Sequence, residues 1–213
     1  RRSSASRSPT EALARLQARW SLGAHLLPMT DAEVDTHVVI DGQYMHFQEW
    51  WTRHRAKLEP QRFENPGITQ ARPAPGVVEA IAAADVVLVA PSNPIVSIGP
   101  VLAVPGIREA LAAAPGLVVG VSPIIGGAPV RGMADVCLRV AGVDCTAAGV
   151  ARHYGARADG GVLDAWLLAE EDAAEAAAVA ALGIDARVVP LWMSDAARTR
   201  ALAVAALDAA GIR

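Results

Sequence analysis

The sequence ADVVLVA at residues 84–90 runs directly into the polar loop PSNPIVSIGP at residues 91–100. A second segment of the same kind follows, with GLVVGV at 116–121 and SPIIGG at 122–127. Short apolar runs rich in Val are typical of strands that helices cover on both faces, and the interval is long enough for one strand–helix–strand crossover. In open α/β sheets ligands bind beyond the carboxyl ends of the strands. We therefore expect the two loops to form one binding site.

Strand and helix patterns alternate along the remaining chain and predict an α/β fold with three layers around a mostly parallel, Rossmann-like sheet. All 213 residues are expected to form a single domain, with residues 43–75 as a helical insertion or lid that carries an aromatic segment. The sequence predicts strands at 25–29, 36–40, 161–168 and 184–190. It predicts helices at 8–23 with Ser8 as cap, 43–58, 77–83, 105–113, 134–140, 146–154, 172–182 and 194–210 with Ser194 as cap.

Composition narrows the classes of function. A hydrophobic fraction of 53% provides a sizeable core, and a net charge of −3 argues against a general basic field for nucleic acid. Arg1, Arg2 and Arg7 lie among serines and predict a flexible end. No apolar run reaches the roughly 18 residues that a membrane span needs, and no signal-peptide pattern is visible, so we expect no membrane association and a cytoplasmic location. Cys137 and Cys145 are expected to be small buried hydrophobes.

The first loop offers groups that could bind a ligand. The Asn93 amide can donate and accept hydrogen bonds, and Ser92 and Ser97 carry hydroxyls. We expect Ser97 to cap a short helix whose backbone N–H groups meet a phosphate. The alternative is that Ser92 and Asn93 only form a turn before Pro94.

The second loop suggests a phosphate site. Gly126 and Gly127 would let the backbone approach a ligand closely, and Arg131 could clamp a phosphate. A solvated Arg131 beside a helix cap is the alternative. The loop matches neither a Walker A motif nor GxGxxG, so its spacing suggests nothing more specific than phosphate binding.

The aromatic segment YMHFQEWW at 44–51 has two interpretations. Aromatic side chains at helical spacing are commonly core residues, but Phe47 and Trp50, with Met45 and His46, could also stack on a flat ring. On an α-helix Trp51 is turned by about 100° from Trp50. We therefore expect one Trp in the core and the other near the cleft, and we favour Trp50 for the cleft.

Four segments together resemble a known family. In order, HLLPMTDAEVDTHV (25–38), YMHFQEWW (44–51), APSNPIVSIGPVL (90–102) and SPIIGGAPVRGMAD (122–135) resemble the 2-phospho-L-lactate transferase family of coenzyme F420 biosynthesis. The similarity extends over roughly residues 8–210. The variant VRGMAD is similar to the actinobacterial branch, which uses phosphoenolpyruvate.

The resemblance implies an activity and its partners. Such an enzyme moves a phospholactyl or phosphoenolpyruvyl group from a guanosine diphosphate-linked donor to the deazaflavin Fo. GMP is released, and F420-0 or its dehydro form is produced. The resemblance also implies a Mg²⁺ cofactor and a homodimer. Because an alcohol attacks a phosphoryl group, positioning and charge neutralisation should dominate catalysis.

The loop and aromatic patterns, combined with the resemblance, assign residues to the two substrates. The nucleotide and its phosphates would be bound by Ser92, Asn93, Pro94, Ser97, Ile98, Ser122, Gly126, Gly127 and Arg131. The deazaflavin would be bound by Met29, Met45, His46, Phe47 and Trp50.

One departure from the family concerns the start of the chain. The family opens with a strand, a Gly-rich loop and acidic metal ligands, and none of these is found here. We therefore expect these residues to form the C-terminal two-thirds of the family fold, with the metal ligands and any catalytic residue unidentified. Two other hypotheses stay open: a non-catalytic nucleotide-binding regulator on the same fold, and an inactive remnant. The aromatic segment argues against a regulator, which has no need of a deazaflavin site.

Overall fold

A four-stranded parallel sheet forms the centre of the molecule in the computed structural model, which describes residues 8–212. Arg1, Arg2 and Arg7 lie outside the described residues. The strands follow the order of the sequence: β4 (Val86–Val89), β5 (Leu117–Val121), β8 (Ala165–Leu168) and β9 (Asp185–Val188). All neighbours are parallel. The carboxyl ends of the four strands therefore lie along one edge of the sheet, as the sequence predicts.

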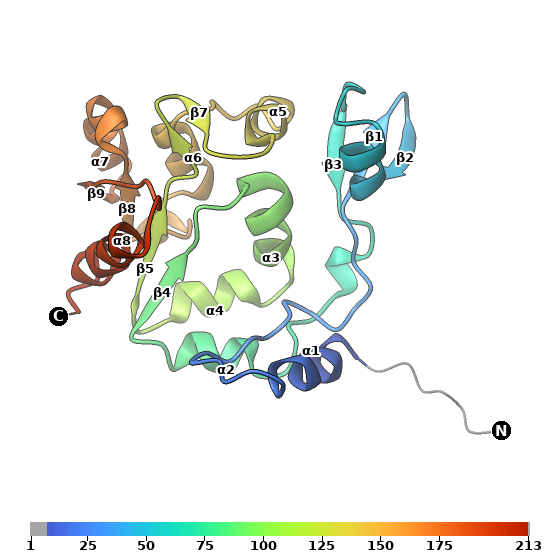
Figure 1. Ribbon diagram of the computed structural model, residues 1–213, viewed down its shortest axis with the longest axis horizontal. Helices are drawn as coiled ribbons and strands as arrows, with labels where there is room; N and C mark the ends of the chain where they lie inside the picture. The colour runs from blue at the N-terminus through green and yellow to red at the C-terminus, as the bar shows by residue number, and fades with distance from the viewer. Residues whose placement is uncertain (1–7, 213) are drawn as a thin grey trace.

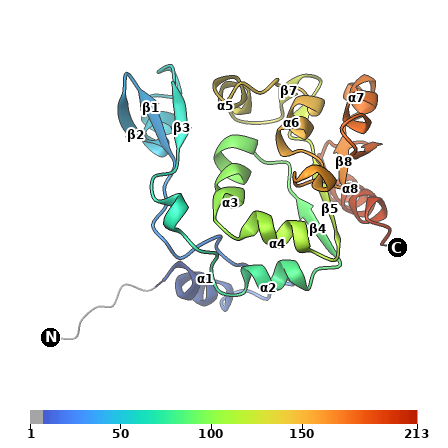
Figure 2. The same ribbon diagram turned by 180° about the vertical axis from the view of Figure 1, so that it is seen from behind.

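Helices cover the sheet on both faces and give three layers, which confirms the predicted architecture (Figures 1 and 2). On one face Leu102, Leu111, Leu138 and Val150 pack with the inward side chains of the strands. On the other face α8 packs through Leu202. The helices are α1 (Pro9–Gln17), α2 (Val77–Ala82), α3 (Gly99–Ala103), α4 (Ile107–Ala113), α5 (Ala134–Val140), α6 (Ala147–Tyr154), α7 (Ala176–Ala180) and α8 (Ala196–Ala209).

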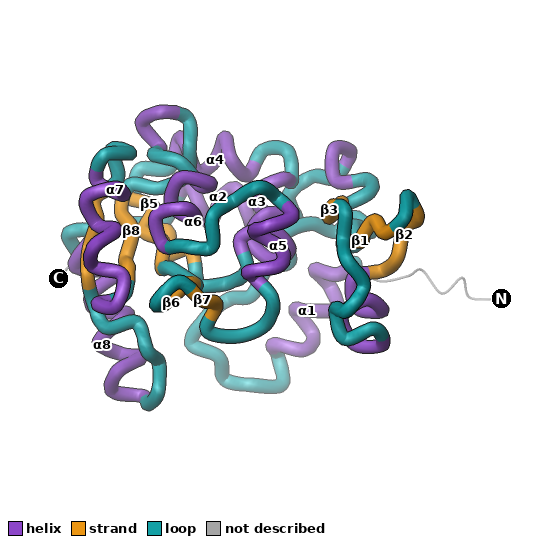
Figure 3. The backbone as a smooth tube through the Cα atoms, turned by 90° about the horizontal axis from the view of Figure 1, so that it is seen from above, coloured by secondary structure: helices purple, strands orange, loops and turns teal. Residues whose placement is uncertain are grey.

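A second, antiparallel sheet lies on the opposite side of the molecule from α7 and α8 (Figure 3). It has the order β2-β1-β3 and consists of β1 (His37–Ile40), β2 (Gln43–His46) and β3 (Arg62–Glu64). Asp41 and Gly42 both have positive φ, 49° and 74°, which suits the two-residue turn of a hairpin. The turn directs residues 43–46 back along β1 as a strand, so the helix predicted over 43–58 is wrong there. Only the following π-helical turn η1 (Glu49–Arg53) and the residues just before it are helical.

Several element boundaries differ from the predictions. Ser8 caps α1, and its hydroxyl accepts the Glu11 N–H at 3.2 Å as predicted, but the helix ends at Gln17 and not near Gly23. No strand forms at 25–29. Asp195, rather than Ser194, caps α8, because its Oδ1 accepts the Arg198 N–H at 2.8 Å.

The shorter elements connect the main ones. They are the helical turns η2 (Ile68–Gln70), η3 (Pro94–Ile98), η4 (Arg157–Asp159) and η5 (Glu170–Glu175), and the hairpin of β6 (Ile124–Ile125) and β7 (Ala128–Pro129). Within residues 8–212 no single helix has the length and apolar character to cross a membrane, although the bent pair of residues 94–103 and 107–113 meets the same criteria by length and composition.

Candidate functional site

The loop after β4 is organised by Asn93. Its Oδ1 accepts the backbone N–H groups of Ile95 at 2.9 Å and Val96 at 3.3 Å, so Asn93 caps the π-helical turn η3. The prediction that Ser97 caps a short helix is wrong, because Ser97 lies inside η3. The Asn93 side chain also contacts the buried thiol of Cys137. The backbone therefore occupies the amide oxygen, whereas the NH2 group has two hydrogens and can still donate to a ligand.

The loop after β5 is held by its own hydrogen bonds. The Ser122 hydroxyl donates to the Ile124 carbonyl at 2.9 Å and accepts the Ile124 N–H at 3.1 Å, and the side chain is buried. Gly126 and Gly127 form the turn between β6 and β7 with φ of 60° and 73°. The Gly126 N–H donates to Asp172 Oδ2 at 3.1 Å. Ser122 therefore shapes this loop, and its hydroxyl is already satisfied.

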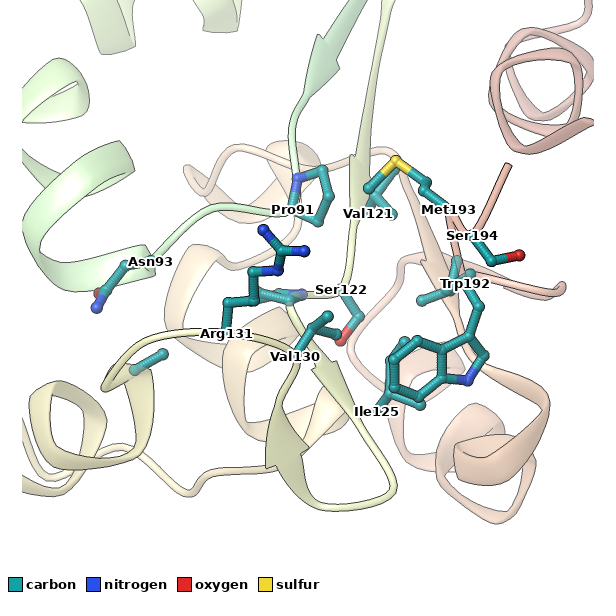
Figure 4. Close-up of a pocket in the computed structure, with 13 residues that line it drawn as sticks. Pro91, Asn93, Val121, Ser122, Ile125, Val130, Arg131, Trp192, Met193 and Ser194 are labelled. Carbon is teal, nitrogen blue, oxygen red and sulfur yellow. The ribbon is translucent and has the colours of Figure 1, made fainter. Parts of the chain in front are cut away.

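A large cavity opens beyond the carboxyl ends of β4, β5 and β9 (Figure 4). Its volume is about 630 Å³. Residues of both loops and of the segment after β9 form its walls: Pro91, Asn93, Val121, Ser122, Pro123, Ile125, Val130, Arg131, Ala134, Leu191, Trp192, Met193 and Ser194. The two loops therefore line one cavity, and its role as a binding site stays a prediction.

A small cavity of about 410 Å³ adjoins the large one. Its walls come from the aromatic segment, the first loop and the start of α5: Phe47, Gln48, Trp51, Pro91, Ser92, Asn93, Val96, Ser97, Arg131, Gly132 and Met133. Pro91, Asn93 and Arg131 line both cavities. Ligands in the two cavities would therefore meet at these three residues.

Arg131 is the one basic side chain among the described residues that line the two cavities. It is exposed, and within residues 8–212 it forms no salt bridge. Figure 4 shows its guanidinium within the large cavity, on the side of Pro91. An unpaired guanidinium can donate to two oxygens of a phosphate at once. The geometry therefore suits an anion at the junction.

The two tryptophans take opposite positions from those we favoured. Trp50 is fully buried, packs edge-on against Phe63 and donates from Nε1 to the Leu58 carbonyl at 2.8 Å. Trp51 is 37% exposed, lines the small cavity and stacks on Phe47 with an interplanar angle of 26°. The prediction of one core and one cleft tryptophan is confirmed, but Trp50 in the cleft is wrong. The indole N–H of Trp50 has a hydrogen-bond partner in the Leu58 carbonyl, which makes its complete burial favourable.

The cavities bring together only part of the predicted site. Phe47, Ser92, Asn93, Ser97, Ser122 and Arg131 line them. Of the described residues predicted to bind ligand, these are not among the cavity-lining ones: Met29, Met45, His46, Trp50, Pro94, Ile98, Gly126 and Gly127.

The physical reasons for their placement differ. Met29 and Ile98 pack against the main core. Met45 lies opposite Val38 in the β1–β2 hairpin, and His46 points toward Asp35 with Nε2 3.9 Å from Oδ1. The glycines occupy the tip of the β6–β7 hairpin, where a Cβ would meet nothing within 4 Å at either position.

Sequence reasoning missed the third wall of the large cavity. Leu191, Trp192, Met193 and Ser194 follow β9, and all four line it. The rule that singled out the loops after β4 and β5 applies equally here, because these residues follow the carboxyl end of a parallel strand.

The donor atoms offer no evident metal site. Among residues 8–212, no group of three or more His, Cys, Asp or Glu side chains could hold an ion. The described residues therefore do not by themselves fit the Mg²⁺ that the resemblance implies.

Curated relatives are similar over nearly the whole chain. The phosphoenolpyruvate transferase of Thermobifida fusca is 54% identical over 196 residues, which are 90% of this chain and 58% of the relative. That of Streptomyces griseus is 54% identical over 205 residues, or 94% of this chain and 62% of the relative. The chain thus spans about three-fifths of the length of these relatives.

Solved structures share the fold, and a family model identifies the family. Protein BH3568 of Bacillus halodurans, described as a UPF0052 family member, superposes with TM-scores of 0.62 and 0.61 in two crystal structures. At 18% and 17% identity, over 93% of this chain and 66% and 67% of that one, this likeness concerns the fold. The model of the family described as 2-phospho-L-lactate transferase CofD matches residues 2–208. The chain therefore belongs to the CofD family.

Proposed function

We propose that the protein transfers a phosphoenolpyruvyl group from a guanosine diphosphate-linked donor to the ribityl hydroxyl of the deazaflavin Fo. Two adjoining cavities that share Asn93 and Arg131 carry this proposal, because a group transfer requires two substrates with their reacting ends together. The donor is chosen because relatives about 50% identical are named phosphoenolpyruvate transferases. The phospholactyl group is the alternative.

In the proposed arrangement the deazaflavin occupies the small cavity. Its flat ring would lie against Trp51, which stacks on Phe47 and is thereby held in place. A Cβ at Gly132 would lie 3.4 Å from the Trp51 ring, so the backbone next to Arg131 lies against this indole. The ribityl tail can therefore extend from Trp51 toward the junction.

The nucleotide donor occupies the large cavity, with its phosphates toward Arg131. The hydroxyl oxygen of Fo bonds to the phosphorus that carries the enolpyruvyl group, and the bond from that phosphorus to the oxygen of GMP breaks. The hydroxyl proton is released, and GMP leaves with the electron pair. Arg131 would neutralise charge on the transferred phosphoryl group, a contribution that grows as charge develops.

The direct test is reconstitution. We expect the purified enzyme with Mg²⁺, Fo and enolpyruvyl-diphosphoguanosine to form GMP and dehydro-F420-0 in equal amounts. The products are separated by chromatography, and the deazaflavin product is measured by its fluorescence. The lactyl donor should react more slowly. Transfer from neither donor, with GDP binding intact, would instead support the nucleotide-binding regulator. The homodimer and the cytoplasmic location stay predictions.

A further inference from the structure

Trp192 is the large aromatic side chain on the wall of the large cavity, and it is not needed to fill the core. It follows β9 and stays 47% exposed. Its indole is nevertheless held, because Nε1 donates to Glu171 Oε1 at 2.8 Å. This hydrogen bond lowers the pKa of Glu171 and keeps the acceptor ionised. An exposed ring with a fixed orientation is well suited to stack on a planar ligand.

Glu171 and its neighbour Asp172 brace two different walls of this cavity. Both lie in η5, directly after β8. Glu171 holds Trp192 on the β9 side, while Asp172 holds Gly126 on the β6–β7 hairpin through Oδ2 at 3.1 Å. Asp172 is only 5% exposed, and carboxylates this deeply buried normally have a polar partner. For Asp172 that partner is the Gly126 N–H. The two walls are thus tied to one short segment, which fixes their separation.

Trp192 and Arg131 complement each other chemically. Figure 4 shows Asn93, Arg131 and Trp192 in that order across the large cavity. The cation lies at the junction with the small cavity, and the indole lies away from it. A nucleotide has the same polarity, with phosphates at one end and a planar base at the other.

We propose that Trp192 is the stacking platform for the guanine base of the donor and that Glu171 positions it. The inference rests on the proposed function, which supplies the identity of the nucleotide. The deazaflavin has its own aromatic residues, Phe47 and Trp51, in the small cavity. Each ring system therefore has a separate aromatic partner, and the two reacting ends meet between them.

Binding of GDP and of Fo, measured separately, tests the proposal. Calorimetry gives the affinity of the protein for GDP, and titration followed by the fluorescence of Fo gives the affinity for Fo. Trp192→Ala should weaken GDP binding by about tenfold or more, the scale of base–aromatic stacking, and leave Fo binding within about twofold. Trp192→Phe should retain most of the affinity. Trp20→Ala is the matched control, because Trp20 is 61% exposed and lines neither cavity.

The role of Glu171 is tested by conservative rescue. Gln can still accept the indole N–H through its amide oxygen, so Glu171→Gln should bind GDP nearly as wild type does. Glu171→Ala should weaken GDP binding by about threefold, the scale of one lost hydrogen bond. Equal losses in both variants would mean that the charge itself matters, and the positioning role would be wrong.

The outcomes separate this inference from the proposed function. If the wild type transfers the group to Fo but Trp192→Ala leaves the KM for the donor and the affinity for GDP unchanged, the stacking role is wrong. If Trp192→Ala loses affinity for Fo and not for GDP, the guanine assignment is overturned. If the wild type transfers nothing while GDP binding still depends on Trp192, the proposed reaction fails and the stacking role stands. A wild type that does not bind GDP overturns both.

Discussion

Asn93 Oδ1 accepts the backbone N–H of Ile95 at 2.9 Å, so the amide that lines both cavities is also the cap of η3. The oxygen is occupied by the backbone, and the NH2 group is the part left to meet a ligand. Structural and binding roles therefore coincide in one side chain, and two substitutions are needed to separate them.

Asn93→Asp keeps the capping oxygen, removes the NH2 donor and adds a negative charge beside the phosphate site. We expect nearly unchanged thermal stability and a donor KM raised about tenfold or more. Asn93→Ala should lose the cap as well and destabilise the fold by about 1 kcal/mol. Thermal melts and steady-state kinetics report the two effects. A donor KM unchanged in Asn93→Asp would leave Asn93 with a capping role only.

Arg131→Gln should reduce the rate of transfer by about tenfold to a hundredfold, the scale of a lost charge-assisted hydrogen bond. The melting temperature should hardly change, since Arg131 is exposed and has no salt-bridge partner among residues 8–212. Arg139→Gln is the matched control on α5. Arg139 pairs with Glu59 at 2.6 Å and lines neither cavity, so its loss should leave the rate unchanged. Unfolding of Arg131→Gln would show a structural role instead.

Trp50→Ala and Trp51→Ala should have opposite effects. Truncation of the buried Trp50 should cost about 3 to 5 kcal/mol of stability, as for other large core aromatics. Trp51→Ala should change stability little and weaken Fo binding by about tenfold. Chemical denaturation and titration of the fluorescent Fo give the two quantities. If Trp51→Ala binds Fo like the wild type, the small cavity is not the deazaflavin site.

The buried thiol of Cys137 predicts a dependence of stability on pH. Burial raises its pKa from 9.0 to about 11. The folded protein therefore retains this proton where the unfolded chain has released it. The resulting stabilisation is complete below pH 9 and is lost as the pH rises through about 11. In urea titrations across this range, Cys137→Ala should lose stability less steeply with pH than the wild type. Equal slopes would contradict the assignment.

The sequence indicated the central sheet well because its strands are short Val-rich runs between strong helix signals. Burial on both faces demands such runs whatever the distant contacts are. The two site loops could be located for the same reason, since the position beyond a parallel strand depends on topology and not on side-chain detail. The segment after β9 obeys the same rule, and Trp192 could have been found from it.

The antiparallel β2-β1-β3 sheet and the aromatic segment beside it could not be predicted in this way. Spacing of the aromatics favoured a helix at 43–58, but pairing with β1 through the Asp41–Gly42 turn made residues 43–46 a strand. The spacing also places Trp50 and Trp51 on the wrong sides, because the buried position depends on Phe63 and on the Leu58 carbonyl. These are tertiary partners, which local periodicity does not reveal.

The shared wall of the two cavities has a kinetic consequence. Cys137 is buried and protonated, and the Ser122 hydroxyl is committed to Ile124, so neither is placed to carry the group between half-reactions. Direct transfer across the wall, as proposed, needs both substrates bound together. Initial rates measured against both substrates should give intersecting double-reciprocal lines, the pattern of a ternary complex, whereas parallel lines would indicate a covalent enzyme intermediate. GMP release from the donor should likewise be negligible until Fo is present.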